Sequence, residues 1–253
     1  MLADSHTHLD RYEAEQLSRI IEGAKRSGVE IFIAASMDLE SSRKTASIAE
    51  AYEEVFSAVG IHPWRAVMID QALYQSLREL ASKKTVAISE IGLDFLRDMS
   101  GDRDLSDPSI KEIQKQAFGE QVRLAREVGL PMIIHCREAH SEMMEILHRG
   151  KASEIGGDIH GFSGDEVMLQ DWLSLGFYIS VGVRSIASLD DIPSLGETYK
   201  KIPSDRLLLE TDSDPSQVKV VANKLAELRG MTPEEMGKLT TDNLKRFLRL
   251  PAW

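Results

Sequence analysis

The chain has 253 residues, of which 42% are hydrophobic and 28% charged, and its formal net charge is −11 at pH 7. This composition is typical of a globular protein, and no apolar run approaches the roughly 20 residues of a membrane-spanning helix. The acidic balance argues against a broad basic surface for long duplex nucleic acid, although bound divalent cations can supply positive charge locally. The single cysteine, Cys136, excludes an internal disulfide, so a reducing cytoplasm is the expected compartment.

Apolar, β-branched segments alternate with amphipathic helical patterns along the chain. The segments expected as strands are 2–6, 29–36, 55–62, 85–92, 131–136, 157–161, 177–183 and 206–212. The segments expected as helices are 13–27, 40–52, 71–83, 108–129, 138–149, 164–175, 194–202, 216–228 and 233–248, the last with Thr232 as its N-cap. Strands that alternate with helices favour a parallel sheet with both faces covered. Eight such units predict an α/β fold, a (β/α)8 TIM barrel formed by residues 1–253 as one domain, with a doubly wound open sheet as the alternative.

Side chains that commonly bind metals lie at the ends of several expected strands. They are His6, His8, Glu90, His135, His160 and Asp212. In a barrel the C-terminal strand ends share one rim, so these six side chains would converge there. Taken singly, a histidine in such a place is more often hydrogen-bonded than a ligand, and Asp212 could cap the helix that follows it. Taken together, four histidines and two carboxylates suit one or two divalent ions such as Mg, Mn or Zn.

Six short motifs and a closing helix lie in order along the chain. They are DSHTHLD at 4–10, GIHP at 60–63, EIGLD at 90–94, IHCREA at 134–139, HGFSG at 160–164, LLETD at 208–212 and TDNLKRF at 241–247. Together they resemble the TatD family of metal-dependent hydrolases in the amidohydrolase superfamily. The resemblance implies a deoxyribonuclease-like activity that cleaves phosphodiester bonds with Mg²⁺ or another divalent ion. DNA ends or short nucleic acid fragments would then be the substrate, with no membrane and no obligate protein partner expected.

The resemblance also implies how the expected ligands divide between two ions. His6 and His8 would bind one ion, and His135 and His160 would bind the second. Glu90 would bridge the two ions and so belong to the catalytic centre.

Further roles follow for residues near these ligands. Asp212 would hold a metal and accept the proton of the attacking water, with Glu210 on the same face as its support. Arg137 could bind a phosphate or pair with a neighbouring glutamate. His62 would contact a phosphate or donate a proton to the leaving group, unless the turn that follows only holds it in place. Trp64 could stack on a base or sugar, or pack a loop.

The chain departs from the family pattern at several positions. Trp64 stands where a second histidine is common, Phe95 where a tyrosine is common, and Gly161 where a cysteine is common. The segment after Asp212 is shorter than usual, and the polar stretch 97–108 is expected to be a mobile loop beside the site. Two alternatives follow. The same metal site could hydrolyse a small ester, lactone, amide or phosphate ester, or the barrel could be a non-enzymatic scaffold, which would be expected to lack a ligand.

Overall fold

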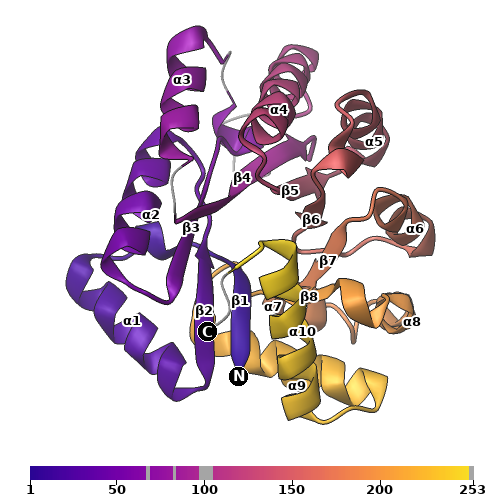
Figure 1. Ribbon diagram of the computed structural model, residues 1–253. Helices are drawn as coiled ribbons and strands as arrows, with labels where there is room; N and C mark the ends of the chain where they lie inside the picture. Colours follow the sequence, from indigo (N-terminus) through magenta and orange to yellow (C-terminus); the bar gives the residue numbers. More distant parts are fainter. Residues whose placement is uncertain (67–68, 82–83, 97–104, 251–253) are drawn as a thin grey trace.

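The computed structural model describes residues 1–66, 69–81, 84–96 and 105–250. Figure 1 shows the strands at the centre of the molecule with helices outside them. The strands are β1 (Leu2–Thr7), β2 (Val29–Ala34), β3 (Val55–Val59), β4 (Thr85–Asp94), β5 (Met132–Arg137), β6 (Gly157–Ile159), β7 (Tyr178–Val181) and β8 (Leu207–Leu209). They pair in parallel in sequence order. This order confirms the barrel, and the doubly wound alternative is wrong because its strand order reverses within the sheet.

Several strand ends differ from the prediction. Strand β4 continues two residues beyond the expected end and includes Asp94. Strands β6 and β8 end earlier, so His160 and Asp212 lie in the loops that follow them. Gly161 and Asp212 have φ angles of 58° and 55°, and a residue in this left-handed region cannot continue an extended strand.

Helices follow each of the first seven strands, and two more follow the last strand. In the described residues they are α1 (Ala14–Arg26), α2 (Leu39–Ala51), α3 (Gln71–Leu80), α4 (Pro108–Val128), α5 (His140–Arg149), α6 (Glu166–Ser174), α7 (Val183–Ala187), α8 (Pro193–Lys201), α9 (Val218–Arg229) and α10 (Pro233–Phe247). Helix α7 was not expected, because the seventh strand was predicted to extend to residue 183. The expected loop 97–108 lies outside the described residues from 97 to 104.

Helix α10 begins as the sequence predicts. The Thr232 side chain accepts a hydrogen bond from the Glu235 backbone N–H at 3.2 Å, and the Glu235 carboxylate accepts one from the Thr232 N–H at 2.9 Å. This reciprocal pair satisfies donors that the first turn of a helix leaves open.

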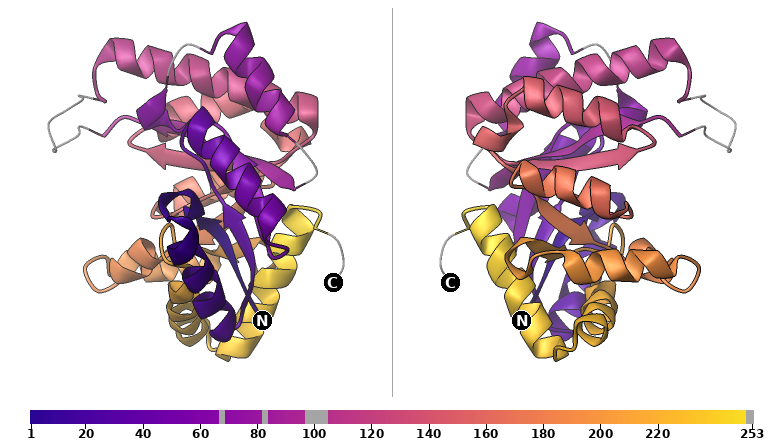
Figure 2. Two further views of the ribbon diagram at one scale, coloured as in Figure 1. Left: turned by 90° about the vertical axis from the view of Figure 1, so that its left-hand side faces the viewer. Right: turned by 90° about the vertical axis from the view of Figure 1, so that its right-hand side faces the viewer.

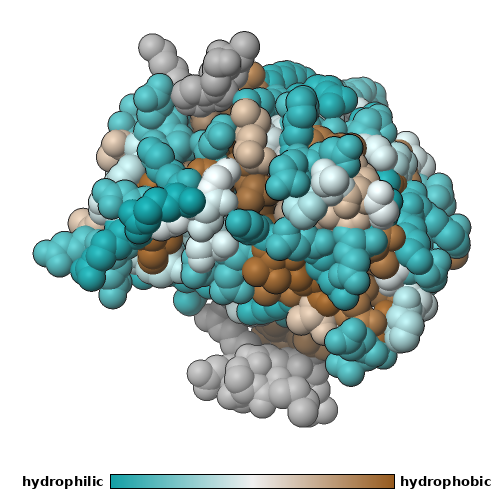
Figure 3. Space-filling model, turned by 90° about the horizontal axis from the view of Figure 1, so that it is seen from below, coloured by the Kyte–Doolittle hydropathy of each residue, from teal (hydrophilic) through white to brown (hydrophobic). Residues whose placement is uncertain are grey.

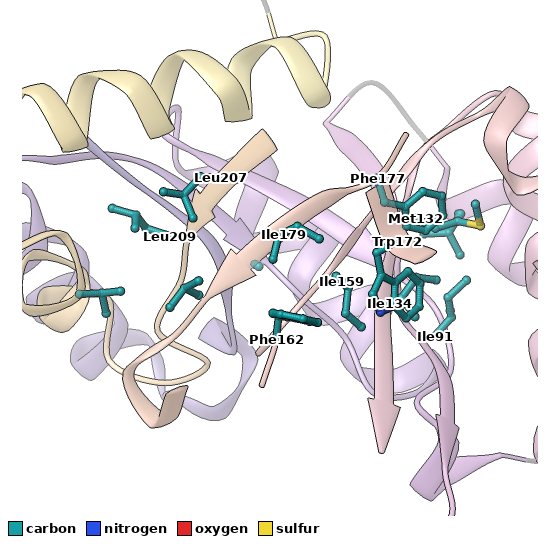
Figure 4. Packing of buried hydrophobic residues seen from close by; sticks show 14 of the residues in the cluster. Ile91, Met132, Ile134, Ile159, Phe162, Trp172, Phe177, Ile179, Leu207 and Leu209 are labelled. Atoms are coloured by element: carbon teal, nitrogen blue, oxygen red, sulfur yellow. The ribbon is translucent and has the colours of Figure 1, made fainter. Parts of the chain in front are cut away.

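Alternate strand positions contribute to two hydrophobic clusters. The larger cluster lies between strands and helices, and Figure 4 shows part of it, with Ile179 and Leu207 from the strands and Trp172 from α6. Among the described residues, the smaller cluster draws on the strands and on the C-terminal part of α10, where Phe247 packs against Tyr178 at a ring distance of 4.9 Å. This smaller cluster is therefore the barrel interior, closed at one end by α10. Figure 2 shows α10 beside the N-terminus, so the C-terminal strand ends form the opposite rim.

The barrel closes between β1 and β8 through a few specific bonds, because the described residues of these two strands form no ladder. The Asp212 backbone N–H donates to the His6 carbonyl at 2.9 Å. The buried Asp4 carboxylate accepts hydrogen bonds from the Thr211 N–H at 3.0 Å, the Thr211 hydroxyl at 2.6 Å and the His6 N–H at 3.2 Å. The join between first and last strands thus lies directly beside two expected metal ligands.

The surface agrees with the acidic, polar composition. The face drawn in Figure 3 is largely hydrophilic, with hydrophobic residues visible between the hydrophilic ones. In the part of the chain that the structure describes, no helix combines the length and the hydrophobicity needed to cross a membrane.

Candidate metal centre

All six expected ligands lie together at the C-terminal rim of the barrel. Their donor atoms fall into groups in which every atom lies within 4.8 Å of the others, and one such group is His6, His8 and Asp212. Further groups of this kind are formed by His6, His160 and Glu210, and by His62, Glu90 and His135. His6 lies on β1 and His8 directly follows it, Glu90 and His135 lie on β4 and β5, and His160 and Asp212 lie in the turns after β6 and β8. The convergence that the sequence predicts is therefore present in the fold.

Glu90 is the centre of this cluster, with five histidine rings around its carboxylate. Oε1 lies 2.7 Å from His160 Nε2, 2.9 Å from His135 Nδ1 and 3.2 Å from His62 Nε2, while Oε2 lies 3.3 Å from His6 Nε2 and 3.5 Å from His8 Nε2. The two oxygens thus face two different groups of nitrogens. This is the arrangement that a carboxylate between two cations requires.

Asp212 lies beside the same histidines but is more accessible than Glu90. Its Oδ1 is 3.2 Å from His8 Nε2 and 3.9 Å from His6 Nε2. Its side chain is 24% exposed, whereas that of Glu90 is 4% exposed. Asp212 is therefore the carboxylate of the cluster that water and substrate can reach.

Burial and neighbouring charges shift the pKa values of the cluster in both directions. Burial raises the pKa of Glu90, but the charges of His62 and His160 hold it well below its usual value. Burial lowers the pKa of His8, yet its bonds to Asp212 and Glu90 raise it to about 9. In the described chain His6 Nδ1 and Nε2 and His8 Nδ1 are buried without a hydrogen-bond partner. Divalent cations fit these residues, because a cation would replace the protons on the rings and use the free nitrogen lone pairs.

Comparison with known proteins identifies the family. Residues 3–249 match the model of the family described as TatD related DNase. The chain belongs to the TatD family. YabD of Bacillus subtilis, named an uncharacterized metal-dependent hydrolase, is 35% identical, and the match covers 99% of this chain and 100% of YabD. A protein of Erwinia billingiae named 3'-5' ssDNA/RNA exonuclease TatD is 30% identical, with 94% of this chain and 95% of that protein covered.

A solved structure agrees with this assignment. The crystal structure of YjjV, a TatD homolog from Escherichia coli K12, superposes with a TM-score of 0.87 at 26% identity, covering 99% of this chain and 98% of that one. The protein is thus a metal-dependent hydrolase of the TatD family, built on a (β/α)8 barrel.

Asp94 is a residue of this TatD-family site to which the sequence analysis assigned no role. Its Oδ2 accepts hydrogen bonds from His135 Nε2 at 2.9 Å and from the Trp64 indole N–H at 2.8 Å. Because Asp94 holds Nε2 of His135, Nδ1 faces Glu90 Oε1 at 2.9 Å, and the ring orientation is set. One signal was available in the sequence. Asp94 lies four residues after Glu90 on one strand, and strand side chains alternate between faces.

His62 is buried beside Glu90. It is 3% exposed, and its Nδ1 accepts a hydrogen bond from the Trp64 backbone N–H at 3.0 Å. Nε2 therefore carries the proton and points at Glu90. Burial lowers the pKa of His62 to about 4, against the opposing charge of Glu90. Trp64 is 42% exposed at the mouth of the site, and its bond to Asp94 fixes the indole beside the cluster.

The remaining expected site residues also lie at this rim. Glu210 is buried, and its Oε1 is 3.4 Å from Nδ1 of His160. Glu210 therefore supports His160 directly. Asp212, the residue that it was expected to support, lies two residues further along the chain. Arg137 is half-buried at the end of β5 and lines the pocket next to the cluster.

Proposed function

We propose that this TatD-family protein is a two-metal phosphodiesterase that acts on DNA ends or short nucleic acid fragments. The observation that carries the proposal is the pair of nitrogen groups on the two oxygens of Glu90. Paired ions suit phosphodiester cleavage, since they stabilise charge on both the attacking and the leaving oxygen. The relative from Erwinia billingiae named as an exonuclease supports the choice of substrate.

The distances to the two Glu90 oxygens support a division of the donor atoms between two ions. His6 and His8, near Oε2, would hold one ion, and His135 and His160, near Oε1, the other, with Glu90 between them. Imidazole and carboxylate ligands accommodate Mn²⁺ and Zn²⁺ and, with water, Mg²⁺. A bound divalent ion supplies charge that makes hydroxide available near neutral pH.

The chain's own residues would then orient water and substrate. Asp212 holds negative charge at the accessible side of the cluster and accepts the proton of the attacking water. His62 keeps Glu90 in place by donating its Nε2–H, and Glu210 keeps His160 in place by accepting from its Nδ1–H. We further propose that residues 1–253 work as one domain. We also propose that the protein works in the cytoplasm, because a chain with a single cysteine has no internal disulfide that reduction could break.

A second candidate keeps the same residues but changes the substrate. The pocket beside the cluster has a volume of about 140 Å³, which accommodates the reacting group of a small ester, lactone, amide or phosphate ester. In that reaction Arg137 and Trp64 would contact a small molecule in place of a nucleic acid strand.

The test is cleavage of end-labelled single-stranded DNA by the purified protein with Mg²⁺, Mn²⁺ or Zn²⁺ in turn. Asp212→Asn should lower kcat at least about 100-fold, since a positioned proton acceptor contributes about 10² to 10⁴ to rates. The matched control is Asp191→Asn, at an exposed aspartate between α7 and α8. Cleavage by the wild type and the control but not by Asp212→Asn supports the nuclease. If the wild type cleaves no DNA but hydrolyses small esters, the second candidate function replaces the nuclease.

A further inference from the structure

The pocket beside the metal centre is lined by residues of the family motifs and by residues outside them. Its lining includes His135, Arg137, His160 and Asp212 from the motifs and Arg184 from outside them. A water molecule occupies about 30 Å³ in the liquid, and pockets for whole small molecules are commonly about 300 Å³ or larger. A volume of about 140 Å³ therefore holds a group of the size of a phosphate with part of a sugar, and not a complete nucleotide.

The two arginines have no acidic partner. Among the described residues, neither Arg137 nor Arg184 has a carboxylate within ion-pair distance, a property that they share with several other arginines on the surface. What sets the two apart is that they line the same pocket beside the metal centre. In a chain with 41 acidic and 30 basic side chains, two guanidinium groups without such a partner on one small pocket favour an anion that comes from outside.

Arg184 is brought to the pocket by α7, the helix that the sequence did not predict. Gly182 precedes this helix, and a Cβ there would lie 2.9 Å from Glu210 Oε1. The absence of a side chain thus lets α7 approach Glu210, which itself contacts His160. Arg184 is consequently held beside the metal ligands, although it is exposed to solvent.

We propose that Arg184, together with Arg137, binds a phosphate one nucleotide away from the bond that is cleaved. This inference rests on the proposed phosphodiesterase function and deepens it. The substrate class is then a single strand that carries a phosphate next to the scissile one, such as a strand end with a terminal phosphate. Guanidinium groups bind phosphate oxygens through paired N–H donors, and each such charged hydrogen bond contributes enough to change affinity about 10- to 100-fold.

Two measurements test the proposal. The first compares kcat/KM for a thymidine dinucleotide that has a terminal phosphate with kcat/KM for the same dinucleotide without it. The second measures, by calorimetry with Mg²⁺ present, the affinity for thymidine 3',5'-bisphosphate relative to thymidine 5'-monophosphate. The wild type should prefer the phosphorylated dinucleotide and the bisphosphate by about 10-fold or more, and both preferences should disappear in Arg184→Gln. Arg184→Lys should retain part of each, since it keeps the charge but loses the paired donors.

The control is Arg19→Gln, which removes an exposed arginine on α1, far along the chain from the pocket. If Arg184→Gln, Arg19→Gln and the wild type all prefer the phosphorylated compounds to the same extent, the phosphate site is overturned while the nuclease proposal stands. A wild type that cleaves neither dinucleotide removes the nuclease function. In that case a preference for the bisphosphate that depends on Arg184 still supports the phosphate site. If this preference is also missing, the phosphate site is overturned as well.

Discussion

Asp4 should be among the residues on which the closure of the barrel depends most. It joins β1 to the segment after β8 by accepting from the Thr211 N–H and by its contact with the Thr211 hydroxyl at 2.6 Å, and it also accepts from the His6 N–H on β1 itself. Asp4→Ala would leave these three buried polar groups without their partner. A buried group without its partner costs about 1 to 3 kcal/mol, so we expect a loss of about 3 to 9 kcal/mol. The free energy of unfolding of native domains is about 5 to 15 kcal/mol, so the variant should be close to unfolding.

Asp4→Asn provides the matched control. Burial raises the pKa of Asp4 to about 8, so at pH 7 the neutral acid predominates and asparagine keeps the same charge. The asparagine oxygen still accepts from the Thr211 and His6 N–H groups. Its NH₂ group replaces the remaining oxygen and donates to the Thr211 hydroxyl, which can accept as well as donate. We therefore expect a cost below about 1 kcal/mol.

Urea unfolding in the presence of a chelator measures these differences without a contribution from bound metal. Fluorescence is a suitable signal, because Trp172 is buried and 1% exposed in the folded chain. Mn²⁺ affinity should fall about 10- to 100-fold in Asp4→Ala, since Thr211 leads directly into Asp212 and outer partners of ligands contribute this much. The reasoning is refuted if Asp4→Ala loses less than about 1 kcal/mol, or if Asp4→Asn loses as much as Asp4→Ala.

Two further predictions concern close packing and metal binding. A Cβ at Gly92, where φ is 147°, would lie 1.9 Å from the His135 carbonyl oxygen. Gly92→Ala should thus cost about 3 kcal/mol or more in urea unfolding, whereas Gly119→Ala on α4 meets nothing within 4 Å and should be neutral or stabilising. Similar stability of the two variants would contradict this. Adding Mn²⁺ at 100 times its Kd should stabilise the protein by about 2.7 kcal/mol, roughly 5 to 10 °C in Tm, with little effect on Glu90→Gln. A wild-type Tm that responds to none of Mn²⁺, Mg²⁺ and Zn²⁺ would count against the metal centre.

The sequence alone predicted the barrel and the convergence of the six side chains proposed as ligands. Both depend on local properties, namely the alternation of strands with helices and the position of a side chain at the end of a strand. The N-cap of α10 was predicted for the same reason, since Thr232 and Glu235 are three residues apart. Where a local backbone angle was decisive, as at Asp212, the predicted strand end was wrong because no pattern in the residues signals a positive φ outside glycine.

Only the tertiary structure decided which residues support the ligands. Asp94 meets a histidine 41 residues away, and Asp4 meets Thr211, which is 207 residues away. Neither distance follows from periodicity, because each depends on how two strands are placed relative to each other. The same holds for Arg184, whose helix begins where a continued strand was expected. The sequence therefore determined which chemistry the rim carries, and the packing of distant segments determined how each group is oriented and what lies beside it.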